Sequence, residues 1–161
     1  MSPKNIGSGV LIHVPQRTGN DCAIAVAAIV ANVPYQTAAE QSSVRPGSRG
    51  LCPLELIRVL ETLSGVPWRT NELRWTRPLF RFADSSHPLV LLVRKPWSRK
   101  IRHYVATWGG KVFDPNMLDG CPHEDYDRRR WRVLQVLRPL DPARLEVARR
   151  DRHWHRCMML D

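Results

Sequence analysis

A run of small and branched apolar residues, CAIAVAAIVAN, occupies positions 22–32 of this chain. Asn20 and Asp21, two residue types that favour the N-cap position, stand directly before it. A helix that is apolar on every side is a buried one. The run therefore predicts a central helix that begins at Cys22 and lies inside the fold.

Two more helices are predicted before the middle of the chain. A short one is expected at residues 35–43, after Pro34 ends the central helix. The segment PLELIRVLETLSG then predicts a helix with Pro53 at its first position and Gly65 just past its end. Residues 65–86 show no clear periodicity, and we interpret them as a loop.

The second half of the chain is rich in predicted strands. Residues 88–95 have the Val/Leu run of a buried strand, and residues 131–139 predict another. Between them, HYVATWGGKVFDP predicts a hairpin that turns at Gly109-Gly110. A last helix is expected after Asp141, with Pro142 at its first position.

Helices first and strands later indicate an α+β fold, with a helical layer packed on an antiparallel sheet. The 161 residues are enough for one domain with a real core, so we expect a single domain over residues 1–161. Residues from about 140 to 161 would form its basic C-terminal helix and tail.

No apolar run approaches the roughly 20 residues of a membrane-spanning helix. The first residues also lack the charged-then-apolar order of a signal peptide. We therefore expect a soluble, cytoplasmic protein without a membrane span. Its four cysteines form no CxxC pair and are expected to be reduced thiols: Cys22, Cys52, Cys121 and Cys157.

A metal or cofactor is not predicted. The sequence HWHRC does place His153, His155 and Cys157 at alternate positions, which could bind a metal if the backbone were extended. We interpret this segment instead as a disordered or surface-bound tail. The remaining histidines and two of the cysteines are interpreted as structural, surface or packed residues: His13, His87, His123, Cys52 and Cys121.

The hairpin carries a candidate pair of catalytic residues. If Gly109 and Gly110 form a two-residue turn, Val105 lies opposite Asp114. His103 and Asp114 are then diagonal neighbours on one face, about 7–8 Å apart at the backbone. In that register, the carboxylate can orient the imidazole from behind.

Cys22 is the matching candidate nucleophile. A helix N-terminus and a neighbouring protonated histidine both favour the reactive thiolate. A third group such as Asp114 would orient His103, as in a Cys-His-Asx triad. Gln16 and the Cys22 N–H could donate hydrogen bonds to the oxyanion. The simpler alternative is that Cys22 is a small packed residue.

Four features of the sequence resemble papain-like cysteine peptidases in their order and spacing. They are Gln16, the segment DCAIA, the segment HYV at residues 103–105 and the pair Asp114-Pro115. The likeness is strongest to the bacteriocin-processing domains, which trim double-glycine leader peptides beside ABC transporters. It covers about residues 14–116, with Ala23 where that family usually has glycine. The resemblance implies a papain-like fold and a thiol peptidase with Cys22, His103, Asp114 and Gln16 in its active site.

Two classes of function remain open. The first is a thiol hydrolase that cuts a peptide or isopeptide bond, or an acyltransferase or deamidase that uses the same residues. The second is a basic module that binds nucleic acid or an acidic protein, in which the cysteine is incidental. No recognised nucleic-acid motif is visible, so a peptide or protein substrate is favoured.

The chain has 25 basic and 15 acidic residues, for a net charge of +10. Five of the basic residues lie in the segment RKPWSRKIR, which leads directly into the strand of His103. This position predicts a positively charged mouth of the active site and a substrate or partner rich in Asp, Glu or phosphate. The alternative is a solvated turn between two strands.

Overall fold

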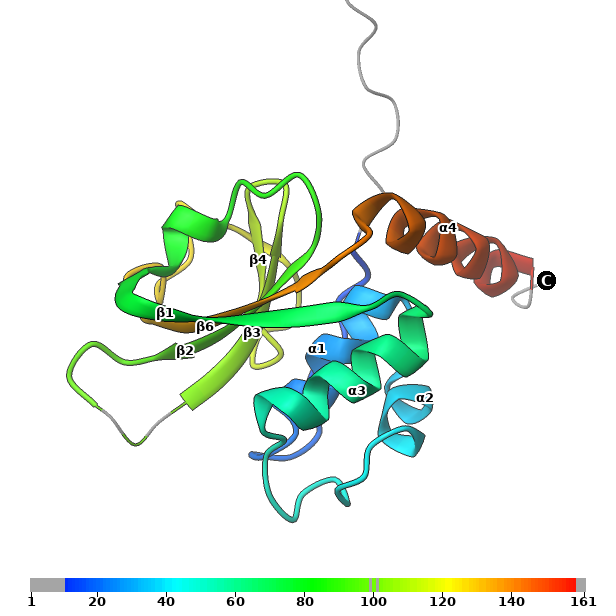
Figure 1. Ribbon diagram of the computed structural model, residues 1–161, viewed down its shortest axis with the longest axis horizontal. Helices are drawn as coiled ribbons and strands as arrows, with labels where there is room; N and C mark the ends of the chain where they lie inside the picture. Colours follow the sequence, from blue (N-terminus) through cyan, green and yellow to red (C-terminus); the bar gives the residue numbers. More distant parts are fainter. Residues whose placement is uncertain (1–10, 99, 101, 159–161) are drawn as a thin grey trace, which may run out of the picture.

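The computed structural model describes residues 11–98, 100 and 102–158, with the backbone alone from residue 153 onward. The described residues form four α-helices, one short 3-10 helix and a six-stranded antiparallel sheet (Figure 1). The predicted α+β class is confirmed. Among the described residues, no helix combines the length and apolar character needed to cross a membrane.

Helix α1 (Cys22–Ala31) is the centre of the fold, as its apolar run predicts. All of its residues except Cys22 are buried. The helix ends at Asn32, which adopts the left-handed conformation with a φ of 55°. Helices α2 (Tyr35–Glu40) and α3 (Pro53–Ser64) pack beside it. Gly65, with a φ of 68°, ends α3 at the predicted position.

The sheet has the strand order β1-β6-β2-β3-β4-β5, so strands distant in sequence lie side by side. The last long strand, β6, lies between β1 and β2 and pairs with both of them. The strands are β1 (Trp68–Pro78), β2 (Leu89–Arg94), β3 (Arg102–Trp108), β4 (Lys111–Phe113), β5 (Cys121–Pro122) and β6 (Arg132–Pro139).

The sheet has an apolar core on each face. The helices cover one face, where α1 packs on β3 (Figure 1). That core includes Leu92, Tyr104 and Ala106 together with the buried residues of α1. A smaller core covers the other face and includes Val105 and Tyr126. Because both faces are covered, the central strands are apolar on both sides.

The predicted hairpin register is confirmed. Trp108 pairs with Lys111, and the pairing continues to Ala106 and Phe113. Gly109 and Gly110 form the turn with φ values of 56° and 80°, a conformation that few other residues adopt without strain. This turn fixes which residues of the two arms face each other.

The interpretation of residues 65–86 as a loop is wrong. This segment forms β1 and the 3-10 helix η1 (Leu79–Phe82). β1 is an edge strand that pairs only with β6, and it carries exposed charged side chains such as Glu72 and Arg74. An edge strand of this kind lacks the apolar alternation from which a strand is predicted.

The last element of the described part of the chain is helix α4 (Pro142–Met158), which begins where the sequence predicts. Asp141 caps it by accepting a hydrogen bond from the Arg144 N–H at 3.0 Å. The backbone of residues 153–158 is part of this helix, so the expectation of a disordered tail is wrong there. The side chains of His153, His155 and Cys157 lie outside the described residues.

Candidate active site

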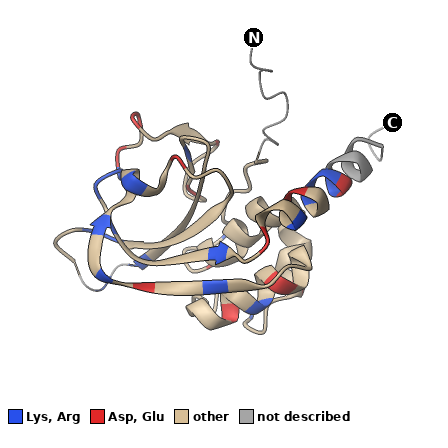
Figure 2. Cartoon of the chain, turned by 45° about the horizontal axis from the view of Figure 1, so that its top comes forward, with Lys and Arg blue, Asp and Glu red and all other residues tan. Residues whose placement is uncertain are grey.

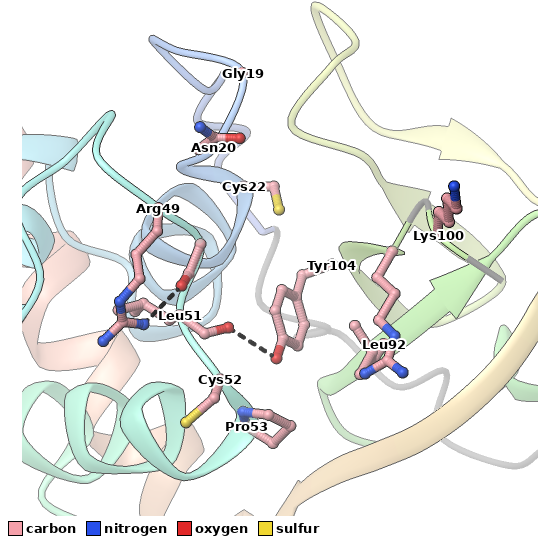
Figure 3. Close-up of a pocket in the computed structure, with 12 residues that line it drawn as sticks. Gly19, Asn20, Cys22, Arg49, Leu51, Cys52, Pro53, Leu92, Lys100 and Tyr104 are labelled. Carbon is pink, nitrogen blue, oxygen red and sulfur yellow. Dashed lines mark hydrogen bonds between the residues drawn. The ribbon is translucent and has the colours of Figure 1, made fainter.

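The first residue of α1, Cys22, lies at the wall of a pocket of about 370 Å³ (Figure 3). Its side chain is partly exposed, so the cysteine is not simply packed in the core. The pocket lies between the start of α1, the loop before α3 and the beginning of β3. It is lined by Gly19, Asn20, Cys22, Arg49, Gly50, Leu51, Cys52, Pro53, Leu92, Lys100, Arg102 and Tyr104.

The loop before Cys22 is held by a buried carboxylate. Asp21 occupies the N-cap position of α1, but its side chain makes no capping hydrogen bond. It accepts instead from the N–H groups of Arg17 and Thr18 at 3.1 and 3.0 Å and from the Tyr35 hydroxyl at 2.5 Å. Asp21 therefore holds the predicted N-cap position, but its side chain fixes the preceding loop and does not cap the helix. As a consequence, Asp21 leaves the N–H groups of the first turn of α1 to other acceptors.

His103 and Asp114 are in direct contact, as the hairpin register predicts. The Nε2 of His103 lies 2.6 Å from Oδ1 of Asp114, and both side chains are buried. Cys22 lies near enough to His103 to raise the pKa of the imidazole. The structure thus brings Cys22, His103 and Asp114 into one connected group.

The surroundings of His103 favour its protonated form. Burial lowers the pKa of the imidazole, but the hydrogen bonds with Asp114 and Cys22 and the negative charge of both groups raise it to about 9. Burial conversely raises the pKa of the Asp114 carboxyl. The hydrogen bond and charge of His103, with donors from Asn116 and Tyr126, lower that pKa to about 2. The two groups form a buried ion pair at neutral pH.

Three further donors fix the Asp114 carboxylate. Oδ1 also accepts from the Asn116 N–H at 2.9 Å. Oδ2 accepts from the Tyr126 hydroxyl at 2.7 Å and from Nη1 of Arg128 at 3.2 Å. Neither Tyr126 nor Arg128 is predicted from the sequence as a site residue. They lie in an irregular segment whose place beside Asp114 no local pattern indicates.

Gln16 lies on the N-terminal arm, which is attached to the segment after Asp114. The Gln16 N–H donates to the Pro115 carbonyl at 2.9 Å, and His13 contacts the Met117 carbonyl through Nε2 at 2.7 Å. The side-chain amide of Gln16 donates to the Thr18 carbonyl at 2.8 Å. Its amide oxygen is buried without a hydrogen-bond partner. Gln16 is not among the residues that line the pocket.

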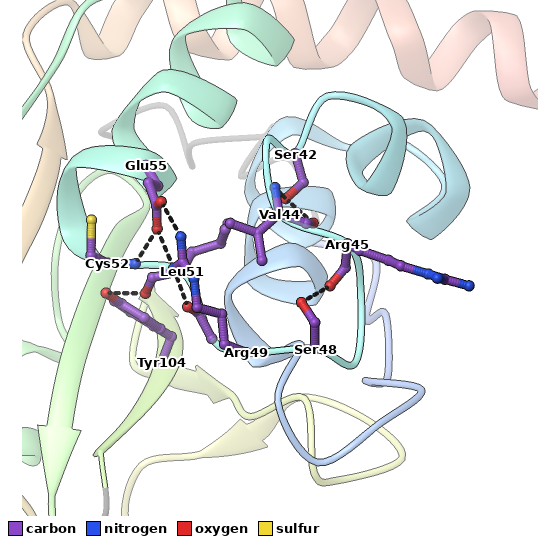
Figure 4. Close-up of polar contacts among 10 residues, drawn as sticks. Ser42, Val44, Arg45, Ser48, Arg49, Leu51, Cys52, Glu55 and Tyr104 are labelled. Carbon is purple, nitrogen blue, oxygen red and sulfur yellow. Dashed lines mark hydrogen bonds and ion pairs between the residues drawn. The ribbon is translucent and has the colours of Figure 1, made fainter.

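Cys52 is not a packed thiol, contrary to the prediction. It is exposed at the start of α3 and lines the same pocket as Cys22. Its N–H donates to Glu55 at 2.8 Å, and Glu55 also pairs with Arg49 at 2.6 Å (Figure 4). The Tyr104 hydroxyl donates to the Leu51 carbonyl at 3.2 Å and holds this loop against β3.

Cys121 and the remaining described histidines lie apart from the pocket. Cys121 is partly buried on β5, and burial and two nearby aspartates raise the pKa of its thiol. His87 contacts the Ser86 hydroxyl, and His123 pairs with Glu124 at 3.0 Å. Among the described residues, no group of three or more His, Cys, Asp or Glu side chains could hold a metal ion.

Comparison with solved structures finds the peptidase domain of Streptococcus mutans ComA, with a TM-score of 0.50. The sequences are 18% identical, and the similarity covers 80% of this chain and 98% of the ComA domain. The sequence matches no protein-family model and no curated protein. The predicted resemblance to this kind of peptidase domain is confirmed at the level of the fold.

Proposed function

We propose that this protein is a papain-like cysteine peptidase in which Cys22 is the nucleophile. The observation that carries the proposal is the buried His103–Asp114 pair beside Cys22, which lies at the wall of a pocket. The arrangement supplies a nucleophile, a base beside it and a group that orients the base. The fold shared with a ComA peptidase domain supports the same activity.

In the first half of the reaction, the Cys22 sulfur attacks the carbonyl carbon of the scissile bond. His103 already carries the proton in its ion pair with Asp114, so the sulfur attacks as the thiolate and a new carbon–sulfur bond forms. The carbon–nitrogen bond then breaks, and the amine leaves with the proton from His103. A thioester on Cys22 remains, and the protonated form of His103 is the general acid of this half-reaction.

In the second half, water attacks the thioester carbon and gives a proton to His103. The carbon–sulfur bond breaks, the carboxylic acid leaves, and the Cys22 thiolate beside protonated His103 is restored. In each half a negative charge develops on the carbonyl oxygen. The Cys22 N–H at the start of α1 is suited to receive it, since Asp21 does not cap that end of the helix.

Alkylation of the free thiols with iodoacetamide at pH 7 tests this proposal without a known substrate. Cys52 is the internal reference, because it lines the same pocket and is more exposed than Cys22. We expect Cys22 to react faster than Cys52, as followed by mass spectrometry of each cysteine peptide. His103→Ala should remove that advantage. A Cys22 that reacts no faster than Cys52 in the parent would contradict the proposal.

Gln16→Ala should lower kcat by about 10²–10³-fold if the amide is the second oxyanion donor. One N–H of the amide donates to the Thr18 carbonyl, so the other is the candidate donor. The thermal midpoint should change little, because the side-chain hydrogen bond that is lost joins Gln16 to a residue only two positions away. Steady-state kinetics separates the roles, since a raised KM with an unchanged kcat would identify Gln16 as a ground-state contact.

Tyr126→Phe removes one donor from the Asp114 carboxylate, so Tyr126 is tested as a positioning residue. With fewer donors, the carboxylate binds the His103 proton more tightly. The alkaline limb of the pH profile of hydrolysis should therefore move to higher pH. The free energy of unfolding should fall by about 1–2 kcal/mol, because a buried hydrogen bond is lost. A loss of stability with an unmoved pH profile would show a purely structural role.

A further inference from the structure

The pocket beside Cys22 carries positive charge that the protein does not neutralise. Its lining includes Arg49, Lys100 and Arg102 but no aspartate or glutamate. The charge of Arg49 is matched by Glu55. Lys100 and Arg102 are exposed and form no ion pair with any residue in the described part of the chain. Figure 3 shows Lys100 across the pocket from Cys22.

The same end of the sheet holds a row of arginines on neighbouring strands. Arg102 on β3 lies directly opposite Arg94 on β2, and Arg94 lies opposite Arg132 on β6. Directly opposed residues project from the same face of a sheet, and like charges in such positions destabilise it. Within the described residues, none of these three arginines pairs with a carboxylate. A bound anion would reduce this repulsion.

Basic residues also lie on other strands and on α4 (Figure 2). The charge at the pocket differs from these because it adjoins the thiol and the strand of His103. Arg102 immediately precedes His103 in β3, and Lys100 lies in the connection that leads into that strand. An anion bound here would therefore lie next to the bond that Cys22 attacks.

From these observations we infer that Lys100 and Arg102 form a subsite for the carboxylate of an Asp or Glu side chain of the peptide substrate. The inference rests on the proposed function. The pocket volume of about 370 Å³ is at the small end of ligand sites and suits a short peptide segment. The planar guanidinium of Arg102 matches a carboxylate in shape and charge.

A nucleic acid is a poorer match for this surface. Base stacking on an aromatic ring is a main source of affinity for single strands. Trp131 is the partly buried aromatic residue nearest in sequence to Arg132, and its ring is contacted by Lys95 at 5.9 Å and by Arg128 at 4.8 Å. That ring is thus engaged by side chains of this chain, and the exposed ring of Trp97 does not line the pocket that contains Cys22, Lys100 and Arg102.

The test compares two alkylating reagents of similar size, iodoacetate with its carboxylate and neutral iodoacetamide. The measured quantity is the ratio of their rate constants at Cys22, read by mass spectrometry. We expect this ratio to exceed the ratio at Cys121, which lies outside the pocket near two aspartates. Raising the salt concentration from about 0.02 to about 0.5 M NaCl shortens the screening length roughly fivefold and should reduce the ratio at Cys22.

Substitution of the two cations assigns the effect to the subsite. Arg102→Gln should lower the iodoacetate-to-iodoacetamide ratio at Cys22 about 3-fold, and Lys100→Gln with Arg102→Gln about 10-fold, as expected for unit charges roughly 6 Å away in water. Arg74→Gln makes the same change of charge on the exposed side of β1 and is the matched control. It should leave the ratio unchanged.

The outcomes separate the two proposals. If Cys22 reacts rapidly with iodoacetamide but its ratio is the same in the parent and the double variant, the subsite is wrong and the peptidase proposal stands. If Cys22 reacts no faster than Cys52 with iodoacetamide, the peptidase proposal fails. The proposed subsite would then also be wrong, because it is defined by the substrate of Cys22, whatever the value of the ratio.

Discussion

Cys22→Ala should abolish peptide-bond hydrolysis and leave the protein folded. Loss of the nucleophile removes the covalent route, so kcat is expected to fall by about 10⁴–10⁶-fold. The side chain is small, partly exposed and at the first position of α1, so few packing contacts are lost. The free energy of unfolding should change by less than about 1 kcal/mol. Release of new N-termini from a denatured protein mixture measures the activity, and thermal unfolding measures the stability.

Cys121→Ala is the matched control for this experiment. It removes a second partly buried thiol, on β5 and outside the pocket, by the same change of side chain. We expect hydrolysis by this variant to equal that of the parent. Activity of Cys22→Ala above a few per cent of the parent value would mean that another group is the nucleophile.

His103→Gln is expected to lower hydrolysis by at least about 10⁴-fold. The substitution removes the protonated imidazole that pairs with the thiolate and protonates the leaving amine, and with it the base that accepts a proton from water in the second half-reaction. Parent activity should also fall as the pH rises through about 9, where His103 loses its proton. The pH profile of hydrolysis checks this limb. A parent profile that stays flat well above pH 9 would show that protonated His103 is not required.

The His103–Asp114 pair should also appear in the pH dependence of stability. Folding raises the pKa of His103, so its contribution is complete below about pH 6.5 and is lost as the pH rises through about 9. Folding lowers the pKa of Asp114, so its contribution is present above about pH 4 and is lost as the pH falls through about 2.

Thermal unfolding across this range measures the contribution without any substrate. In His103→Gln, the fall in thermal midpoint between about pH 6.5 and 9 should become shallower than in the parent. His123→Gln is the control, because it removes a histidine that pairs with Glu124 away from the pocket. Equal slopes for the parent and His103→Gln would contradict the ion pair.

Local patterns in the sequence were sufficient to predict the elements that carry Cys22, His103 and Asp114. The helix at Cys22 follows from ten residues with hardly a polar side chain, because such a segment is stable only when it is buried. The contact between His103 and Asp114 follows from the Gly109-Gly110 turn. A two-residue turn sets the register, and the register sets which side chains share a face.

Tertiary structure alone decided the surroundings of these residues. Tyr126 and Arg128 reach Asp114 from an irregular segment, and Cys52 and Arg49 enter the pocket from the loop before α3. Each of these contacts joins segments that no helical or strand period relates. They depend on how the chain packs as a whole, whereas a local pattern reports only the face that a residue shares with its neighbours in sequence.

The edge strand β1 and the row of arginines also show which features a local pattern predicts and which depend on tertiary structure. β1 has exposed charged residues because one of its sides has no partner strand, and its sequence therefore lacks the apolar alternation of a typical strand. Arg94, Arg102 and Arg132 are spread over 39 positions of the chain, and strand pairing brings them side by side. The sequence by itself determined that the segment RKPWSRKIR is basic. Only the order of the strands decided that Arg94, Arg102 and Arg132 lie next to one another at the end of the sheet near Cys22.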